Sequence, residues 1–121
     1  MKQIIKILVI DDSPVVFKAI KRVLEPQGYQ FVGQAFNGRE GLEMIAQHQP
    51  DLIFLDISMP VMDGIEAAEI LMSKDPSVQV IMMSAMGDEE LQNRAKGIGV
   101  KVFLTKPFRS EDLIRIARNL L

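Results

Sequence analysis

The sequence predicts an α/β fold in which a parallel β-sheet is covered by helices on both faces. Short apolar segments rich in β-branched residues alternate with longer segments of helical periodicity. Three of the apolar segments contain almost no polar residues. Strands that are buried on both faces have this composition, and parallel strands need long, usually helical, connections. The strict alternation therefore predicts a doubly wound sandwich of five strands and five helices with right-handed crossovers.

The predicted strands are the five apolar, β-branched segments. They cover residues 4–10, 31–35, 52–55, 78–83 and 100–104. Each is followed by polar or turn-forming residues, which is typical of a strand end. We therefore expect the carboxyl ends of these strands to lie along one edge of the sheet, where doubly wound folds place their functional sites.

The predicted helices lie between the strands and carry recognisable start and stop signals. Ser13 and Pro14 provide an N-cap and a proline at the first helical position, and Gly28 follows the end of that helix. Helical patterns then cover residues 38–49 and 65–73. The fourth begins in the acidic run at 88–90, where negative charge suits the helix dipole, and the last covers 110–121.

Size, charge and composition narrow the classes of function. The 121 residues fit one domain, residues 1–121. A net charge of −2 gives no general electrostatic reason to bind nucleic acid or an anionic membrane, and no apolar run is long enough to span a bilayer. The absence of cysteine excludes disulfides and cysteine chemistry. We expect a cytoplasmic protein that binds neither nucleic acid nor a membrane directly.

Polar residues follow four of the five predicted strands. They are Asp11 and Asp12 after the first, Asp56 after the third, Ser84 after the fourth and Lys106 after the fifth. Three carboxylates this close would repel one another unless a cation intervened. Oxygen ligands without any soft ligand are typical of a Mg²⁺ site.

Asp56 is the candidate nucleophile of this cluster. A carboxylate can attack phosphorus to form an acyl phosphate. The transfer then requires positioning and neutralisation of the phosphoryl oxygens, for which Mg²⁺, the Lys106 ammonium and the Ser84 hydroxyl with the backbone N–H of Ala85 are available. The sequence therefore predicts a phosphoryl-accepting site.

Each residue also has an ordinary structural interpretation. Asp11 and Asp12 could belong to a helix cap, Asp56 could end a strand in a turn, and Lys106 could be a solvated surface residue. The joint occurrence of all of them at strand ends favours a functional site. A further alternative is an interaction module with this fold that is not switched, although the intact residue set disfavours it.

Two enzyme classes with similar sheets fit less well. A phosphatase with an aspartate nucleophile would place that nucleophile after the first strand, with a second acid two residues later, whereas Asp11 and Asp12 are adjacent. A flavin protein would place a Ser/Thr-rich phosphate loop there, and two carboxylates would repel the phosphate.

The motifs resemble response-regulator receiver domains of the CheY type. The matching stretches are Val-Ile-Asp-Asp-Ser at 9–13, Asp-Leu-Ile-Phe-Leu-Asp-Ile-Ser-Met-Pro at 51–60, Met-Asp-Gly at 62–64, Met-Ser-Ala at 83–85 and Phe-Leu-Thr-Lys-Pro-Phe at 103–108. The resemblance covers nearly the whole chain. It implies a flavodoxin-like three-layer sandwich with strand order 2-1-3-4-5.

The resemblance also implies roles for individual residues. Asp56 would be the phosphoacceptor and a metal ligand, together with Asp11, Asp12 and the Ser58 backbone carbonyl. Ser84 and Lys106 would contact the phosphoryl group, and the Lys106–Pro107 bond would be cis. Phe103 would be an aromatic switch coupled to Ser84.

The partners implied by the resemblance are a histidine kinase or a His-containing phosphotransfer protein, which would supply the phosphoryl group. A downstream protein would recognise the surface of helix four, strand five and helix five. The chain would catalyse its own phosphorylation and dephosphorylation without acting on an external substrate. Lys101 stands where many dimerising receivers carry an acidic residue, so we expect a monomer or a weak dimer.

Overall fold

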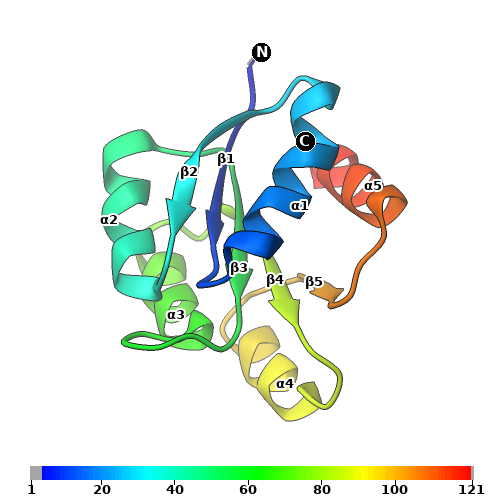
Figure 1. Cartoon of the computed structure of the whole chain (residues 1–121). Helices are drawn as coiled ribbons and strands as arrows, with labels where there is room; N and C mark the ends of the chain where they lie inside the picture. The colour runs from blue at the N-terminus through cyan, green and yellow to red at the C-terminus, as the bar shows by residue number, and fades with distance from the viewer. Residues whose placement is uncertain (1–3, 121) are drawn as a thin grey trace.

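The computed structural model describes residues 4–120 as alternating strands and helices (Figure 1). The strands are β1 (Lys6–Ile10), β2 (Gln30–Ala35), β3 (Leu52–Asp56), β4 (Gln79–Ser84) and β5 (Val102–Thr105). The helices are α1 (Pro14–Leu24), α2 (Gly38–His48), α3 (Gly64–Lys74), α4 (Glu89–Gly97) and α5 (Ser110–Leu120), with a short 3-10 turn, η1 (Glu25–Gln27), after α1.

The sheet has the strand order β2-β1-β3-β4-β5, and every pair of neighbouring strands is parallel. Helices α1 and α5 cover one face, and α2, α3 and α4 cover the other. The predicted fold class and strand order are therefore confirmed. None of the helices within residues 4–120 combines the length and the apolar character that crossing a bilayer requires.

Alternate residues of the central strands serve two separate cores. Leu8 and Ile53 pack in the core under α2, α3 and α4, whereas Ile7 and Phe54 pack in the core under α1 and α5. All four are fully buried. Because both faces of these strands are covered, both sets of alternating side chains have to be apolar, which explains the continuous apolar composition of the sequence.

The strand boundaries differ from the predicted ones where polar residues belong to the sheet. Asp56 pairs with Met83 in the β3–β4 ladder, and Ser84 pairs with Thr105 in the β4–β5 ladder. Both had been expected just beyond their strands. Residues 100 and 101 precede β5 instead of opening it, after Gly99 with its positive φ of 110°. The predicted helix end at residue 121 lies outside the described residues.

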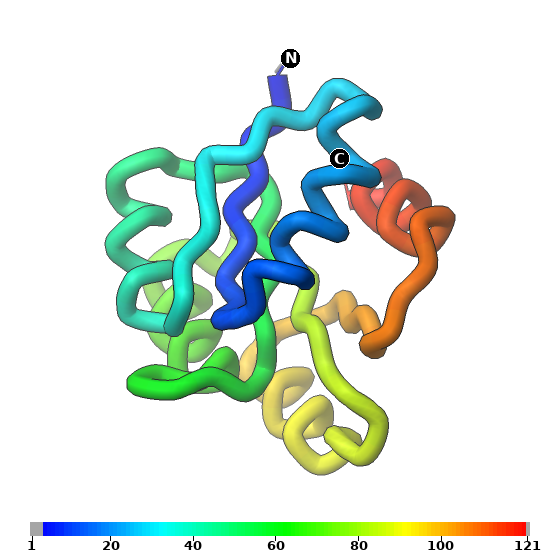
Figure 2. Tube along the Cα trace, viewed as in Figure 1, coloured from blue at the N-terminus to red at the C-terminus, as the bar shows by residue number. Residues whose placement is uncertain are grey.

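The carboxyl ends of the strands meet at one edge of the sheet. Figure 2 shows the segments that follow β1, β3 and β4 at the lower end of this view. These segments are distant in sequence but continue from neighbouring strands. This edge is where the predicted site residues gather.

Candidate functional site

Three carboxylates lie together at the carboxyl edge of the sheet. Asp11 follows β1 and is fully buried, Asp56 ends β3 and is 7% exposed, and Asp12 is exposed. One ligand oxygen of each lies within 4.8 Å of those of the other two. The central position of β1 and β3, side by side in the sheet, brings Asp11 and Asp56 together.

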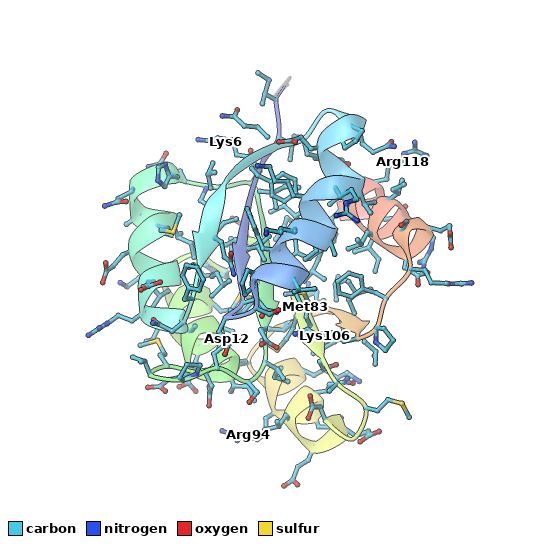
Figure 3. The ribbon with its side chains drawn as sticks, in the orientation of Figure 1. Lys6, Asp12, Met83, Arg94, Lys106 and Arg118 are labelled. Carbon is cyan, nitrogen blue, oxygen red and sulfur yellow. The ribbon has the colours of Figure 1, made fainter. Side chains whose placement is uncertain are left out.

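Lys106 reaches this cluster from the segment between β5 and α5. Its Nζ lies 2.9 Å from Oδ2 of Asp11 and 3.4 Å from Oδ1 of Asp56. Its backbone N–H donates to the carbonyl of Ser84 at 2.7 Å, which ties the segment to β4. The Lys106–Pro107 peptide bond is cis, as the resemblance implied. Figure 3 shows Lys106 and Asp12 at this end of the molecule.

The Asp11 carboxylate is fixed on both of its oxygens. Oδ1 accepts the backbone N–H of Ser13 at 2.8 Å, while Oδ2 accepts Lys106. The backbone carbonyl of Asp11 accepts Nε2 of Gln34 at 2.8 Å. Nothing in the sequence alone indicates that Gln34, a residue of β2, spans to the end of β1.

Burial and charge set the protonation of the cluster. Burial, followed by the charge of Asp11, raises the pKa of Asp56 from 3.8 to about 6, although Lys106 and the backbone N–H of Ser58 oppose this rise. Burial lowers the pKa of Lys106, but its bonds and charge interactions with Asp11 and Asp56 outweigh that effect, so the pKa is raised overall. Lys106 therefore stays protonated near neutral pH.

The donor set fits a hard divalent cation. Three carboxylates face one ammonium group, so the cluster keeps an excess of negative charge when all of them are ionised. The raised pKa of Asp56 reflects that excess together with burial. Within residues 4–120 the Asp12 carboxylate has no hydrogen bond or ion pair, which leaves its oxygens free for a ligand role. Oxygen ligands of this kind suit Mg²⁺.

The loop after β3 packs tightly against the site. The Ser58 backbone N–H donates to the Asp56 carboxylate, and Ser58 itself is exposed; a ligand role for its carbonyl stays a prediction. Gly64 begins α3 directly against the backbone carbonyl of Asp56, in the space that a Cβ would need. Its N–H donates to the Ile57 carbonyl at 3.1 Å. Gly64 belongs to the Met-Asp-Gly stretch at 62–64, but the sequence alone does not reveal this contact.

Ser84 lies at the end of β4 but is bonded to α4 and not to the carboxylate cluster. Its Oγ is buried and accepts Nε2 of Gln92 at 2.6 Å. The next backbone N–H, that of Ala85, donates to Oδ2 of Asp88 at 2.8 Å. The structure thus gathers Asp11, Asp12, Asp56 and Lys106 and leaves Ser84 occupied elsewhere. No feature of the sequence alone indicates that Gln92 contacts Ser84.

Phe103, the predicted switch residue, is half-buried in β5. It lies opposite Met82 in the ladder and packs against the core under α2, α3 and α4. The Lys96 ammonium lies 5.7 Å from the centre of its ring, within the range of a cation–π contact. Its switching role stays a prediction.

Comparisons with known proteins identify the family of the chain. Residues 7–118 match the family described as response regulator receiver domain. The chemotaxis protein CheY of Listeria monocytogenes is 38% identical over 110 residues, covering 91% of this chain and 92% of that protein. CheY of Bacillus subtilis is 35% identical over 116 residues, with coverages of 96% and 97%.

Solved structures give the same result. The receiver domain of NtrX from Brucella abortus matches with a TM-score of 0.88 at 30% identity, covering 95% of this chain and 97% of that one. The CheX-CheY-BeF3-Mg²⁺ complex from Borrelia burgdorferi matches with a TM-score of 0.89 at 30% identity, with coverages of 96% and 88%.

The doubly wound parallel sheet, with an acidic cluster at its carboxyl edge, defines the class as an α/β receiver fold. The chain belongs to the response regulator receiver domain family and is of the CheY type, a component of two-component systems.

Proposed function

We propose that this chain accepts a phosphoryl group on Asp56 in a Mg²⁺-dependent reaction and thereby switches its surface for a downstream protein. The observation that carries the proposal is the arrangement of Asp56 beside Asp11, Asp12 and Lys106, with the carboxylate oxygens within 4.8 Å of one another. The donor would be a phosphohistidine of a histidine kinase or of a His-containing phosphotransfer protein.

In the proposed reaction an oxygen of the ionised Asp56 carboxylate attacks phosphorus. The new O–P bond forms as the N–P bond of the phosphohistidine breaks, and the departing electron pair stays on the imidazole nitrogen, which takes up a proton. Lys106, already 3.4 Å from Asp56, would neutralise a phosphoryl oxygen without moving far. Ser84 and the Ala85 N–H would serve another oxygen after leaving their partners on α4.

Asp11, Asp12, Asp56 and the Ser58 carbonyl would hold Mg²⁺. When bound, the ion would supply positive charge to the developing charge on the phosphoryl oxygens. The Borrelia burgdorferi CheY complex contains BeF3 and Mg²⁺, which supports the same pair of ligands for this chain. Asp11 is held by Ser13 and Lys106, so its carboxylate is oriented in advance.

The proposed output is the surface formed by α4, β5 and α5. Phe103 lies in β5 between the core and this surface, and a change at Ser84 in the adjoining strand would alter its packing. A downstream protein would bind that surface; CheX in the Borrelia burgdorferi complex is an example of a protein assembled with a CheY. The proposal includes a cytoplasmic monomer or weak dimer that acts on no external substrate.

The test is phosphorylation by acetyl phosphate with Mg²⁺, followed by intact-mass measurement. We expect one phosphoryl group on the native chain and none on Asp56→Asn, while Asp75→Asn, which changes an exposed carboxylate, behaves as the native chain does. Amide NMR shifts on activation should include α4 and β5. Equal labelling of Asp56→Asn, or labelling that does not depend on Mg²⁺, would refute the proposal.

A further inference from the structure

We propose that Asp88 and Gln92, at the start of α4, form a latch that holds Ser84 and Ala85 away from Asp56 and so limits how strongly the site binds a phosphoryl group. This inference rests on the proposed function, because it concerns how that site is regulated. Asp88 and Gln92 are positioning residues, since they touch the groups that would contact the phosphoryl oxygens and not the reacting atoms.

The first part of the latch is the bond from Gln92 to Ser84. Nε2 of Gln92 donates to Oγ of Ser84 at 2.6 Å, and Ser84 is only 1% exposed. A buried hydroxyl that loses its partner without gaining another costs free energy. Ser84 can therefore leave Gln92 only when a new acceptor or donor near Asp56 replaces that bond.

The second part is the bond from Ala85 to Asp88. The Ala85 N–H donates to Oδ2 of Asp88 at 2.8 Å, and the Asp88 N–H donates back to the Ala85 carbonyl at 3.3 Å. A backbone N–H has one proton to donate. The Asp88 carboxylate therefore occupies the same donor that a phosphoryl oxygen on Asp56 would need, and the two negative groups would compete for it.

The other helices show where the Asp88 carboxylate would otherwise bind. The side chains of Asn37 and Asp63 precede α2 and α3 and accept the backbone N–H three residues later, at 2.9 Å in both cases. Ser13 does the same for α1 at 3.3 Å. Asp88 holds the equivalent position before α4 but makes no such cap. The Asp88 carboxylate therefore bonds the amide of Ala85 instead of an amide in the first turn of α4.

The intervening segment can change without disturbing a core. Met86 is 87% exposed, and Gly87 has a positive φ of 94° with no atom near the position of a Cβ. The latch thus exchanges one set of hydrogen bonds for another across an exposed turn. By reciprocity, whatever fixes the start of α4 in its latched form weakens phosphoryl binding at Asp56, and phosphorylation frees the start of α4.

The experiment is a titration of the full chain with beryllofluoride in the presence of Mg²⁺, followed by NMR. We expect Asp88→Ala and Gln92→Leu each to bind beryllofluoride about fivefold more tightly, the factor that corresponds to one net hydrogen bond of about 1 kcal/mol. Affinity for Mg²⁺ alone should stay within about twofold of the native value, since a general loss of structure would lower both.

Matched controls lie on the same turn of α4. Glu89→Ala removes a neighbouring exposed carboxylate, and Asn93→Leu adds the same apolar group as Gln92→Leu at an exposed position. Both should bind beryllofluoride within about twofold of the native chain. Asp88→Asn keeps an oxygen acceptor but loses the charge, so it should fall between the native chain and Asp88→Ala. In the metal-free protein, the Ala85 amide should exchange faster in Asp88→Ala.

The outcomes separate the two proposals. If the native chain binds no beryllofluoride, or Asp56→Asn binds it equally well, the proposed function fails and the latch fails with it. If the native chain responds as expected but Asp88→Ala and Gln92→Leu bind beryllofluoride no more tightly than Glu89→Ala and Asn93→Leu, only the latch is overturned. The same holds if the Ala85 amide is unaffected by Asp88→Ala.

Discussion

The two sides of the site are prepared to different degrees. On the side of β1 and β3, Asp11 and Asp56 are buried next to each other and already share the Lys106 ammonium. On the side of β4, Ser84 and Ala85 are bonded to α4 and do not take part in the cluster. Under the proposed function, the phosphoacceptor is thus assembled in advance, whereas the groups that would contact a further phosphoryl oxygen would have to be recruited from α4.

The surroundings of each side explain this difference. The β1–β3 side lies in the middle of the sheet and is closed by Gly64 against the Asp56 backbone, so little there can move. The β4 side continues into an exposed turn with Met86 and Gly87. Close packing fixes geometry, and exposed turns with few buried contacts allow it to change. Under the proposed function, this difference would separate the phosphoryl chemistry from the signalling within one site.

The largest expected effect comes from removing the Lys106 ammonium from the β1–β3 side of the site, which we call the assembled side. Lys106→Met should slow phosphorylation by acetyl phosphate by roughly 10²–10³-fold, the usual cost of losing one stabilising group at a developing charge. The fully buried Asp11 carboxylate would also lose its ion pair. Phosphorylation rates of the purified variants at saturating Mg²⁺ measure this effect.

Lys101→Met is the matched control, because Lys101 is an exposed lysine near the start of β5. It should leave the rate within about twofold. A Lys106→Met rate close to the native one would mean that the assembled side does not need its cation, and the contrast between the two sides would lose its basis.

The next effect concerns the packing that closes the assembled side. In Gly64→Ala the new Cβ would collide with the backbone carbonyl of Asp56, so α3 or β3 has to shift. We expect a loss of about 3 kcal/mol in the free energy of unfolding, at the upper end of overpacking costs, together with weaker Mg²⁺ binding. Urea unfolding monitored by circular dichroism measures the change.

Gly97→Ala tests the β4 side of the site, where we expect the opposite effect on stability. Gly97 ends α4, and no atom lies near the position of its Cβ. Alanine should stabilise the protein by about 0.5 kcal/mol because it restricts the unfolded chain and suits a helix. Equal effects of the two substitutions would contradict the proposed difference in packing.

The last expected effect, smaller than that of Gly64→Ala, is the electrostatic cost of the metal-free cluster, which depends on pH. The pKa of Asp56 is raised to about 6 in the folded protein, so the folded state binds a proton more strongly than the unfolded chain does. The stability due to this group is present below about pH 4 and is lost as the pH rises through about 6. The full rise from 3.8 corresponds to about 3 kcal/mol, and partial exposure and relaxation should reduce it to about 2.

Asp56→Asn should therefore stabilise the metal-free protein at pH 7.5 by about 2 kcal/mol and have little effect at pH 4. The measurement is the difference in free energy of unfolding between variant and native chain across this pH range, which cancels the other carboxylates. Adding Mg²⁺ at pH 7.5 should stabilise the native chain more than the variant. A difference that does not change with pH would contradict the raised pKa.

The sequence was sufficient to predict the fold because strands buried on both faces of a sheet have an almost wholly apolar composition. Residues 52–55 are apolar at every position because alternate side chains enter different cores. Start signals such as Ser13-Pro14 and the acid before α4 are local and equally visible. The gathering of Asp11, Asp56 and Lys106 also followed from local information, since parallel strands bring their carboxyl ends to one edge.

Only the tertiary structure decided how the gathered groups are bonded. Three contacts depend on distances between elements. Lys106 pairs with Asp11 as well as Asp56. Gly64 leaves no room for a side chain, and Gln92 donates to Ser84. Strand and helix periodicities fix which face a residue lies on, but a hydrogen bond requires atoms placed to within a few tenths of an ångström. Composition and periodicity thus determined the fold and the edge at which Asp11, Asp56 and Lys106 meet. Packing alone determined that these groups contact one another while Ser84 is bonded to α4.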